Sequence, residues 1–395
     1  MALNLVRNSK VFFTTNVDSL GKVLASGFDA TNTQEIQVLD GFTFSQNTNS
    51  DTVTISEAGS APVRGQRAFN TSLAPVDFSF SSYIRPSFDD TGAVVDAEES
   101  VLWNAIAGTG AIGAAGAGWI ADDAYSSATF ANSNAHQLQK FGMIFIVDQV
   151  AYVVDNCSLN QVTIDFGLDA IATGAWTGQG TTLRQAGNGI TAVGGTFGGT
   201  GLAGAYKVKN TTANYITNKL STVSLALVKD LKDATGSTVA ASGSSYTVPI
   251  TGGSITINNN INYSTPSNLG TVNAPVTYYT GQRAITGTLN AYLRTGASET
   301  GTGKLLANML SAASVTVEPM FALAISIGGG ANPVKVVLDM PSTVLTIPTV
   351  DVQQVVSTAI NFTAQGSTGT GNSAVYDLTQ TNDITVKYYS PDLTV

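Results

Sequence analysis

Side chains that commonly carry out chemistry are scarce in this chain of 395 residues. There is one cysteine, Cys157, and one histidine, His136, so neither an internal disulfide nor a Cys/His metal cluster can form. The acidic pairs Asp89–Asp90, Glu98–Glu99 and Asp122–Asp123 are adjacent in sequence and are typical of solvated turns. We expect Cys157 to be a small buried apolar residue and His136 to serve packing or the surface.

Catalytic motifs are missing as well. The sequence contains no G-x-S-x-G and no H-E-x-x-H. The segment "GGTFGGTGLAG" superficially suggests a nucleotide loop, but it lacks the lysine and follows no clear parallel β-α unit. These observations predict a protein that is not an enzyme and has no cofactor and no metal site.

The composition indicates which elements build the fold. Hydrophobic residues make up 43% of the chain, charged residues only 11%, and there are 40 glycines. Runs of Thr, Val, Ile and Tyr between Gly, Asn and Ser clusters are typical of strands and turns. The sequence therefore predicts a mainly β protein, with β-sandwich or barrel units that each carry one short α-helix.

Apolar alternation and apolar runs predict the individual elements. The two helices are expected at Ser100–Ala107 and Gly303–Ala312. The strands are expected at Val6–Thr14, Ile36–Gln46, Val76–Ile84, Phe141–Val154, Gln161–Phe166 and Ala170–Trp176, and then at Lys219–Lys229, Ser254–Tyr263, Ile285–Leu293, Phe321–Ile327, Val334–Leu338, Thr343–Ile347, Val355–Thr363 and Ile384–Tyr389.

Segments of the first part of the chain recur, in the same order, in the second part. The matched pairs are "GFTFSQN" with "GSITINN", Ala-Pro-Val with Ala-Pro-Val, "VDFSFSSYIR" with "ITGTLNAYLR", "VLWNAI" with "LLANML", "FGMIFIV" with "FALAISI", and "AWTGQG" with "NFTAQG". A second Gly-Gln-Arg-Ala match competes with the Tyr-x-Arg match for register. The alternation of apolar residues favours the register that places Val76 opposite Ile285 in the alignment.

The repeats predict duplication and fusion of one unit. Copy one spans 1–183, a Gly-rich linker spans 184–205, and copy two spans 206–395 with a C-terminal strand. Copy one carries a Gly/Ala-rich insertion at 108–133, which we interpret as a long surface loop.

Two long uncharged stretches, Val101–Ala121 and Gln185–Tyr206, have the length of a membrane span. Both are crowded with Gly and Thr, which disfavours that interpretation. The N-terminal segment lacks the apolar core of a signal peptide. We therefore expect a protein made in the cytoplasm, without export and without membrane contact.

Several segments together carry a resemblance over nearly the whole chain. They are "RNSKVFF", "TNTQEIQV", "VTISEAG", "VPITGGSITINNNINYSTP", "TGTLNAYL" and "TIPTVDVQQVVSTAINFTAQG". With them, the chain resembles the duplicated, trimer-forming tail tube proteins of tailed bacteriophages. The resemblance implies two tandem tail-tube-type domains and a structural role in the virion tail, with assembly in the host cytoplasm.

The same resemblance implies stacked trimeric, pseudo-hexameric rings that conduct DNA from capsid to host. The implied partners are the chain itself, a tape-measure protein and transiently the genome in the lumen, without specific DNA binding. Tail initiator and terminator proteins are further implied partners, as is a sheath if the tail is contractile. Four inner strands per copy would give a barrel of 24 strands, roughly 50 Å across, leaving roughly 40 Å inside its side chains.

A conduit for DNA should not hold phosphates, because Lys and Arg contacts bind them without sequence preference. The net charge is −9, and residues 1–183 contain 7 basic and 18 acidic residues. An alternative is that this acidity serves only solubility. The polar faces of two predicted strands supply the candidate lumen-facing residues, with two further aspartates: Asp77, Ser79, Ser81, Asp165, Asp169, Thr286, Thr288 and Asn290. The alternative orientation would place this polar face outside.

Rival functions remain at this point. A baseplate or tail-terminator protein could share the fold. An extracellular β-rich adhesin could share the composition, although it should carry an export signal.

Overall fold

The computed structural model describes residues 9–25, 27–39, 41–55, 59–60, 65–89, 94–108, 118–122, 125–130, 138–147, 150–185, 207, 215–269, 272–294, 300–316, 318–329, 334–352, 354–377 and 383–390. Within this part the protein is mainly β, as predicted, with two α-helices. These are α1 (Ser100–Ala107) and α2 (Thr302–Ala312). Two short 3₁₀ turns, Asn218–Leu220 and Gly371–Ser373, complete the helical elements of the described residues.

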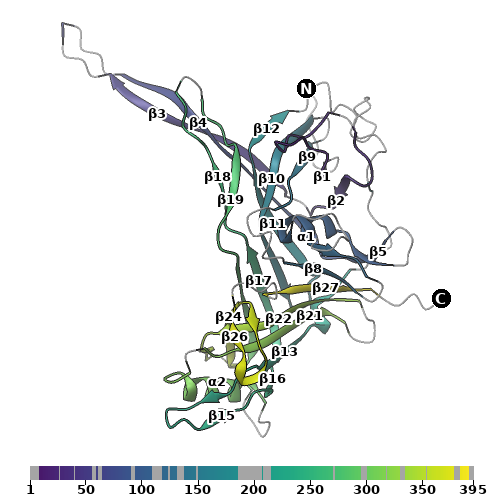
Figure 1. The fold of residues 1–395 in the computed structure, drawn as a ribbon, viewed down its shortest axis with the longest axis vertical. Helices are drawn as coiled ribbons and strands as arrows, with labels where there is room; N and C mark the ends of the chain where they lie inside the picture. The colour runs from purple at the N-terminus through teal and green to yellow at the C-terminus, as the bar shows by residue number, and fades with distance from the viewer. Residues whose placement is uncertain are drawn as a thin grey trace.

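Strands occupy both halves of the chain (Figure 1). In the first half they are β1 (Lys10–Thr14), β2 (Thr33–Ile36), β3 (Thr43–Ile55), β4 (Gly65–Tyr83), β5 (Pro86–Phe88), β6 (Val95–Ala97), β7 (Trp119–Ile120), β8 (Ser126–Thr129), β9 (Phe141–Val147), β10 (Val150–Gly167), β11 (Thr173–Gly180) and β12 (Thr182–Gln185). In the second half they are β13 (Thr222–Leu227), β14 (Leu231–Lys232), β15 (Thr238–Ala240), β16 (Ser245–Thr247), β17 (Ile250–Asn258), β18 (Ile261–Ser264), β19 (Thr277–Thr280), β20 (Ala284–Tyr292), β21 (Phe321–Gly328), β22 (Lys335–Leu345), β23 (Thr349–Asp351), β24 (Ser357–Ala364), β25 (Ser367–Thr368), β26 (Val375–Tyr376) and β27 (Thr385–Tyr389).

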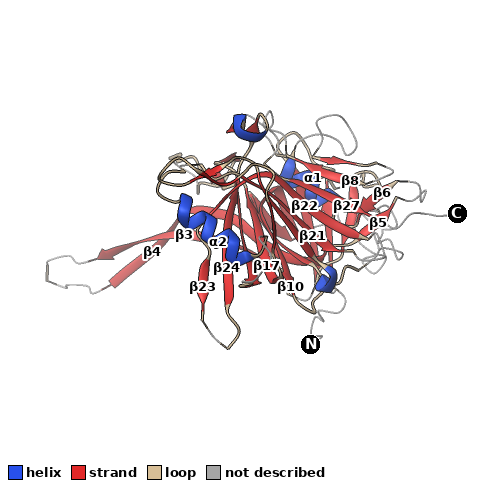
Figure 2. Ribbon diagram, turned by 90° about the horizontal axis from the view of Figure 1, so that it is seen from below, coloured by secondary structure: helices blue, strands red, loops and turns tan. Residues whose placement is uncertain are grey.

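The predicted helices and most predicted strands are present, but several boundaries are wrong. The predicted strand Ile36–Gln46 is interrupted, because β2 ends at Ile36 and β3 begins only at Thr43. The predicted strand Gln161–Phe166 is the distal part of β10. Strand β3 and its partner β4 also extend into an exposed arm that projects from the body (Figures 1 and 2). The arm side chains are largely exposed, Val53 and Phe69 among them, so no buried face marks the length of these strands in the sequence.

One sheet runs through both halves. In the first half β4 lies between β3 and β11, and β10 pairs with the other edge of β11. In the second half β20 lies between β17 and β24, and β22 and β23 pair with the other edge of β24. Residues Gln161–Gly167 of β10 pair with Asn258–Gly252 of β17 and join the two halves. The order of strands is therefore the same in each half.

The register also corresponds. Tyr83 of β4 is opposite Thr173 of β11, and Tyr292 of β20 is opposite Ser357 of β24. The corresponding Tyr-x-Arg segments thus occupy matching places in the two halves. The heptapeptide match "GFTFSQN" with "GSITINN" is off by one residue, since Phe42 and Phe44 pack on the core while the core side chains of β17 are Ile255 and Ile257.

One pair of facing residues consists of a phenylalanine and a glycine in each half, on opposite strands in the two halves. In the first half Phe78 on β4 faces Gly178 on β11, and in the second half Gly287 on β20 faces Phe362 on β24. A Cβ at Gly178 would lie 2.3 Å from Cζ of Phe78, and one at Gly287 would lie 2.4 Å from Cζ of Phe362. Each pair has room for one ring only, so a glycine is required opposite it.

The predicted surface loop at Gly108–Ser133 is wrong for the residues of it that the structure describes. They include β7 and β8, and Trp119, Ala128 and Phe130 are buried in the main core. The prediction failed because the surrounding Gly/Ala-rich composition hides these short strands. Residues 109–117 and 131–137, which include His136, lie outside the described residues.

The C-terminal strand bridges the two halves. β27 pairs with β22 on one side and with β8 of the first half on the other. The first two residues of the predicted linker at 184–205 are part of a strand, because Arg184 and Gln185 lie in β12, which pairs with β10. Residues 186–205 are outside the described part. A single hydrophobic cluster contains side chains of both halves, so the halves share one core.

A network of buried hydrogen bonds connects β27 to α1. The Tyr388 hydroxyl donates to Oε1 of Glu99 at 2.5 Å and accepts from the Trp103 indole N–H at 2.6 Å. The backbone N–H of Arg85 also donates to the Glu99 carboxyl, at 3.3 Å. Burial raises the pKa of Glu99 to about 7, because a charged carboxylate is poorly solvated there.

We expect the free energy of unfolding of the chain to fall as the pH rises from 4.5 to about 7. Glu99 binds its proton more tightly in the folded chain than in the unfolded chain, so its contribution is complete below pH 4.5 and is lost as the pH rises to about 7. A shift of this size corresponds to a loss of about 3 kcal/mol. Urea unfolding at a series of pH values should show this slope in the wild type and a reduced slope in Glu99→Gln. Equal slopes in both proteins would contradict the prediction.

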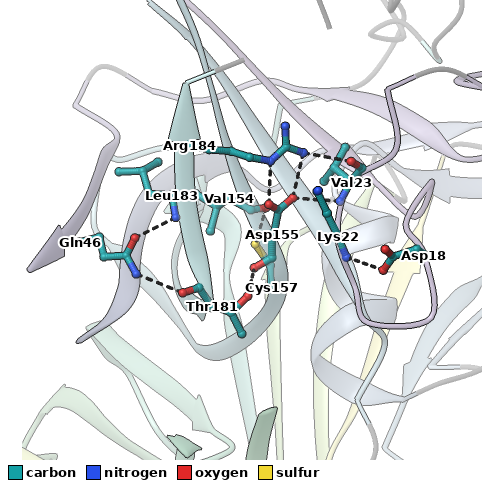
Figure 3. A network of polar contacts seen from close by, with 10 residues as sticks. All are labelled: Asp18, Lys22, Val23, Gln46, Val154, Asp155, Cys157, Thr181, Leu183 and Arg184. Atoms are coloured by element: carbon teal, nitrogen blue, oxygen red, sulfur yellow. Dashed lines mark hydrogen bonds and ion pairs between the residues drawn. The ribbon is translucent and has the colours of Figure 1, made fainter. Parts of the chain in front are cut away.

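A second polar network holds β12 and the loop before β2 against β10 (Figure 3). Oδ2 of Asp155 accepts from Nε of Arg184 at 2.7 Å, and its Oδ1 accepts from Nη2 of Arg184 at 3.1 Å and from the Val23 N–H at 2.9 Å. Gln46 of β3 binds the carbonyl of Thr181 and the N–H of Leu183. The network therefore positions β3 as well as β12.

Asp155→Ala should destabilise the chain by about 2–4 kcal/mol, since it leaves a half-buried guanidinium and a buried N–H without their acceptor. The control is Lys219→Ala, which removes the exposed ion pair between Lys219 and Asp169 and should change stability little. Chemical denaturation of the variants checks the difference. Similar effects of both substitutions would refute this account of the Asp155 network.

Candidate functional site

The most extended candidate functional surface is the polar face of the sheet that joins the halves. Its segments are residues 43–46, 76–83, 158–167, 173–180, 250–258, 284–292, 344–351 and 357–364, and we call their outward side the polar face. Across it, side chains line up in rows that cross the boundary between halves. One row comprises Ser81, Ala175, Thr163, Thr256, Thr286 and Thr363.

Seven of the eight predicted lumen-facing residues lie on this one face. Asp77, Ser79 and Ser81 are on β4, Asp165 is on β10, and Thr286, Thr288 and Asn290 are on β20. All seven are exposed or half-exposed, and they alternate with core residues such as Phe78, Phe80 and Leu289. The alternation arises because successive side chains of a strand point to opposite faces.

Asp169 is not part of the face. It lies in the turn between β10 and β11, with a positive φ of 61°, and pairs with Lys219 at 2.7 Å. Its spacing from Asp165 would suit the same face only if β10 continued, but the strand ends at Gly167.

Polar groups on the face bind one another across strands. Thr43 and Ser79 hydroxyls are 2.8 Å apart, and the Gln179 amide donates to Asp77 at 2.8 Å. The Thr288 hydroxyl donates to Asn361 at 2.7 Å. These hydrogen bonds therefore link hydroxyl, amide and carboxylate groups of the polar face to one another.

One such bond crosses the boundary between the halves. The hydroxyls of Thr163 on β10 and Thr256 on β17 are 3.0 Å apart. The polar face is therefore continuous where the halves meet.

The charges on the face have one sign. Its eight segments contain Asp77, Asp165 and Asp351, and they contain no Lys, Arg or Glu. Asp351 was missed by sequence reasoning because β23 is only three residues long and gives no alternation signal. Its place was detectable only through the pairing of Asp351 with Ser357, which matches the pairing of Asp165 with Thr173.

The other groups that could carry out chemistry, the Cys157 thiol and the Asp96–Lys207 pair, are engaged in structural contacts. Cys157 is buried, as expected, and its thiol donates to the carbonyl of Val154 at 3.3 Å. Burial raises the pKa of this thiol well above its usual value, which keeps it unreactive. A cavity of about 380 Å³ between β2 and α1 is bordered by Asp96 and Lys207, which pair with each other at 3.2 Å.

Two searches of the described residues give negative results. No group of three His, Cys, Asp or Glu side chains there is arranged to hold a metal ion. The helices of that part are all too short or too polar to cross a membrane.

Comparison with known proteins agrees with the sequence resemblance. No protein-family model matches the chain. It is 30% identical over 372 residues to the tail tube protein pb6 of Escherichia phage T5, an alignment that covers 92% of this chain and 73% of the relative. The mainly β fold is consistent with that relationship. The chain thus belongs to the bacteriophage tail tube proteins, structural components of the virion tail.

Proposed function

We propose that this chain polymerises as stacked trimeric, pseudo-hexameric rings whose lumen conducts DNA from the capsid to the host. The observation that carries the proposal is the continuous sheet whose polar face has aspartates as its charged residues. The halves at 1–183 and 206–395 are interpreted as duplicated units that share a core. Their common strand order, their matching register and the exchanged Phe and Gly pairs support that interpretation.

The orientation of the polar face follows from the energetics of passage. Duplex DNA carries a dense row of phosphates, and each Lys or Arg contact to it releases counterions and adds non-specific affinity. A wall with carboxylates and no cations repels the phosphates instead. Hydroxyls and amides that are engaged with one another also offer fewer donors to a passing phosphate. This face is therefore assigned to the lumen.

The dimensions are compatible with a duplex. Each chain contributes eight strand positions to the sheet, counting β22 and β23 as one, so three chains supply 24. A barrel of 24 strands has a diameter of roughly 50 Å, and roughly 40 Å remains inside the side chains.

The proposed partners follow from this role. They are other copies of the chain, a tape-measure protein and transiently the genome in the lumen, and initiator and terminator proteins at the tube ends. A sheath would be added in a contractile tail. As a conduit wall, the chain needs no catalytic group.

The number of chains in a ring tests the assembly. Native mass measurement of the smallest closed ring should give three chains, because two sheet units per chain complete a ring of six units. Electron microscopy should show long tubes. A ring of six chains would contradict the pseudo-hexameric arrangement, and single capped rings without tubes would favour a baseplate or terminator role.

The charge of the face can be tested on assembled tubes. Replacing Asp77, Asp165 and Asp351 with Lys should create duplex binding that weakens as salt rises, whereas replacing them with Asn should create little. Co-sedimentation of a short labelled duplex with tubes measures this. The control is a set of Lys substitutions at the exposed positions Thr222, Thr238 and Ser245, which lie on other strands. Tubes of this control should co-sediment with less duplex. Equal binding in both sets would argue against a lumenal polar face.

A further inference from the structure

One end of the polar face carries a tyrosine in each half of the chain. Tyr83 ends β4, two residues beyond Ser81, and Tyr292 ends β20, two residues beyond Asn290. Because side chains two residues apart on a strand share a face, both tyrosines continue the polar face. Tyr292 is 49% exposed. The two aromatic rings therefore belong to the surface assigned to the lumen and not to the core.

The neighbours of the two tyrosines on the polar face also match. In each half, the tyrosine is opposite a hydroxyl residue, and that residue is opposite an aspartate on the next strand. The two rows are Tyr83, Thr173 and Asp165 on β4, β11 and β10, and Tyr292, Ser357 and Asp351 on β20, β24 and β23. We call them the aromatic–acidic rows. Their ring and carboxylate are two strands apart, which is about 10 Å.

Exposed aliphatic side chains lie just beyond both aromatic–acidic rows. Leu168, in the turn between β10 and β11, is 58% exposed, and Val352, in the turn between β23 and β24, is 78% exposed. Ile171 and Val355 of the same two turns are exposed as well. Exposed apolar groups that gather in this way beside polar ones are typical of an interaction surface.

The combination of groups indicates the kind of ligand. A carboxylate attracts a cation, and the face of a tyrosine ring binds a guanidinium or ammonium group. The segments of the polar face contain no Lys or Arg, so the face itself supplies no competing cation. A polypeptide with Arg or Lys beside Leu or Val offers a partner to the ring, the carboxylate and the aliphatic turn. A polyamine offers cations alone, and duplex DNA offers phosphates, which the carboxylates repel.

The first half shows the aromatic part of this recognition within the chain. The guanidinium of Arg85 lies 4.6 Å from the ring centroid of Tyr215, and the Tyr215 ring packs edge-on against Tyr83 at 5.4 Å. In the second half, none of the cations in the described part of the chain lies over the ring of Tyr292. That ring is therefore available to a cation from outside the chain.

We propose that the aromatic–acidic rows bind a cationic polypeptide that lies in the lumen. Its Arg or Lys side chains contact the tyrosine rings and the carboxylates, and its apolar side chains contact the aliphatic turns. The inference rests on the proposed function, because a ring of three chains with two rows each places six rows around the channel. The carboxylates that repel phosphates attract this polypeptide, so the same wall retains a protein and lets DNA pass.

Binding of a defined peptide to tubes of the full-length chain tests the site. The probe is a labelled helical peptide of Leu, Ala and Arg, and the comparison probe carries Glu in place of Arg. Fluorescence anisotropy should show that the tubes bind the Arg peptide roughly ten-fold or more tightly than the Glu peptide at low salt, because the wall is acidic. Asp165→Asn should weaken this binding at low salt and have less effect at high salt.

Substitution of the rings separates aromatic recognition from simple charge attraction. Tyr292→Leu should weaken binding of the Arg peptide about three-fold, and Tyr83→Leu with Tyr292→Leu about ten-fold, since each exposed ring loses one cation contact. Tyr292→Phe retains the ring and should bind as the wild type does. The matched control is Tyr279→Leu, which removes an exposed ring of β19 outside the polar face and should leave binding unchanged.

The outcomes distinguish the peptide site from the tube. Tubes that bind no Arg peptide, or that bind it equally in Tyr292→Leu and Tyr279→Leu, overturn the site and leave the conduit standing. Single chains that form no tubes but bind the Arg peptide with the predicted order of variants retain the site and contradict the conduit, because Tyr292 and Asp165 are exposed in the single chain. Tubes that retain a short duplex more tightly than the Arg peptide contradict both.

Discussion

Strands β10 and β17 come from different halves of the chain, yet residues Gln161–Gly167 of one are bonded to Gly252–Asn258 of the other. Much of the architecture depends on this pairing. It extends a four-stranded unit into a sheet of twice the width, buries Ile164 and Phe166, and places Asn259 at the end of α1. Without it, the strand edge of the first half would carry backbone groups with no partner in the sheet.

The two faces of this sheet follow from strict alternation along its strands. On the inner side, rings and branched side chains such as Phe78, Trp176, Ile255 and Ile360 enter a core shared by both halves. On the polar face, Thr, Ser, Asn and Gln groups bind across strands, and within its eight segments Asp77, Asp165 and Asp351 are the charged residues. A sheet built this way can line a channel for a polyanion without holding it, because repulsion is present and phosphate donors are few.

Sequence reasoning recovered a large part of this arrangement. The helix at Ser100–Ala107 was predicted with its observed boundaries, since its apolar run is short and flanked by acidic residues and glycine. Six of the candidate lumen residues share a face because they were chosen by alternation on two strands, and alternation fixes the side of a strand. Asp165, chosen as a further aspartate, shares the face because β10 continues to Gly167. Asp169 lies off this face because β10 ends at Gly167, and a strand end depends on the turn that follows it. The strands at Trp119–Ile120 and Ser126–Thr129 were not predicted, because their Gly- and Ala-rich flanks resemble a loop.

The amino-acid sequence by itself determined the β class, the repeated segments, the low number of cations and the membership in the tail tube family. These properties are local or additive, so they can be read along the chain. Only the tertiary structure decided that the halves share a sheet and a core, that β27 crosses to β8, and that Asp351 takes the place of Asp165. Those features depend on which distant strands pair, and pairing is set by the burial of whole faces, which no single segment encodes.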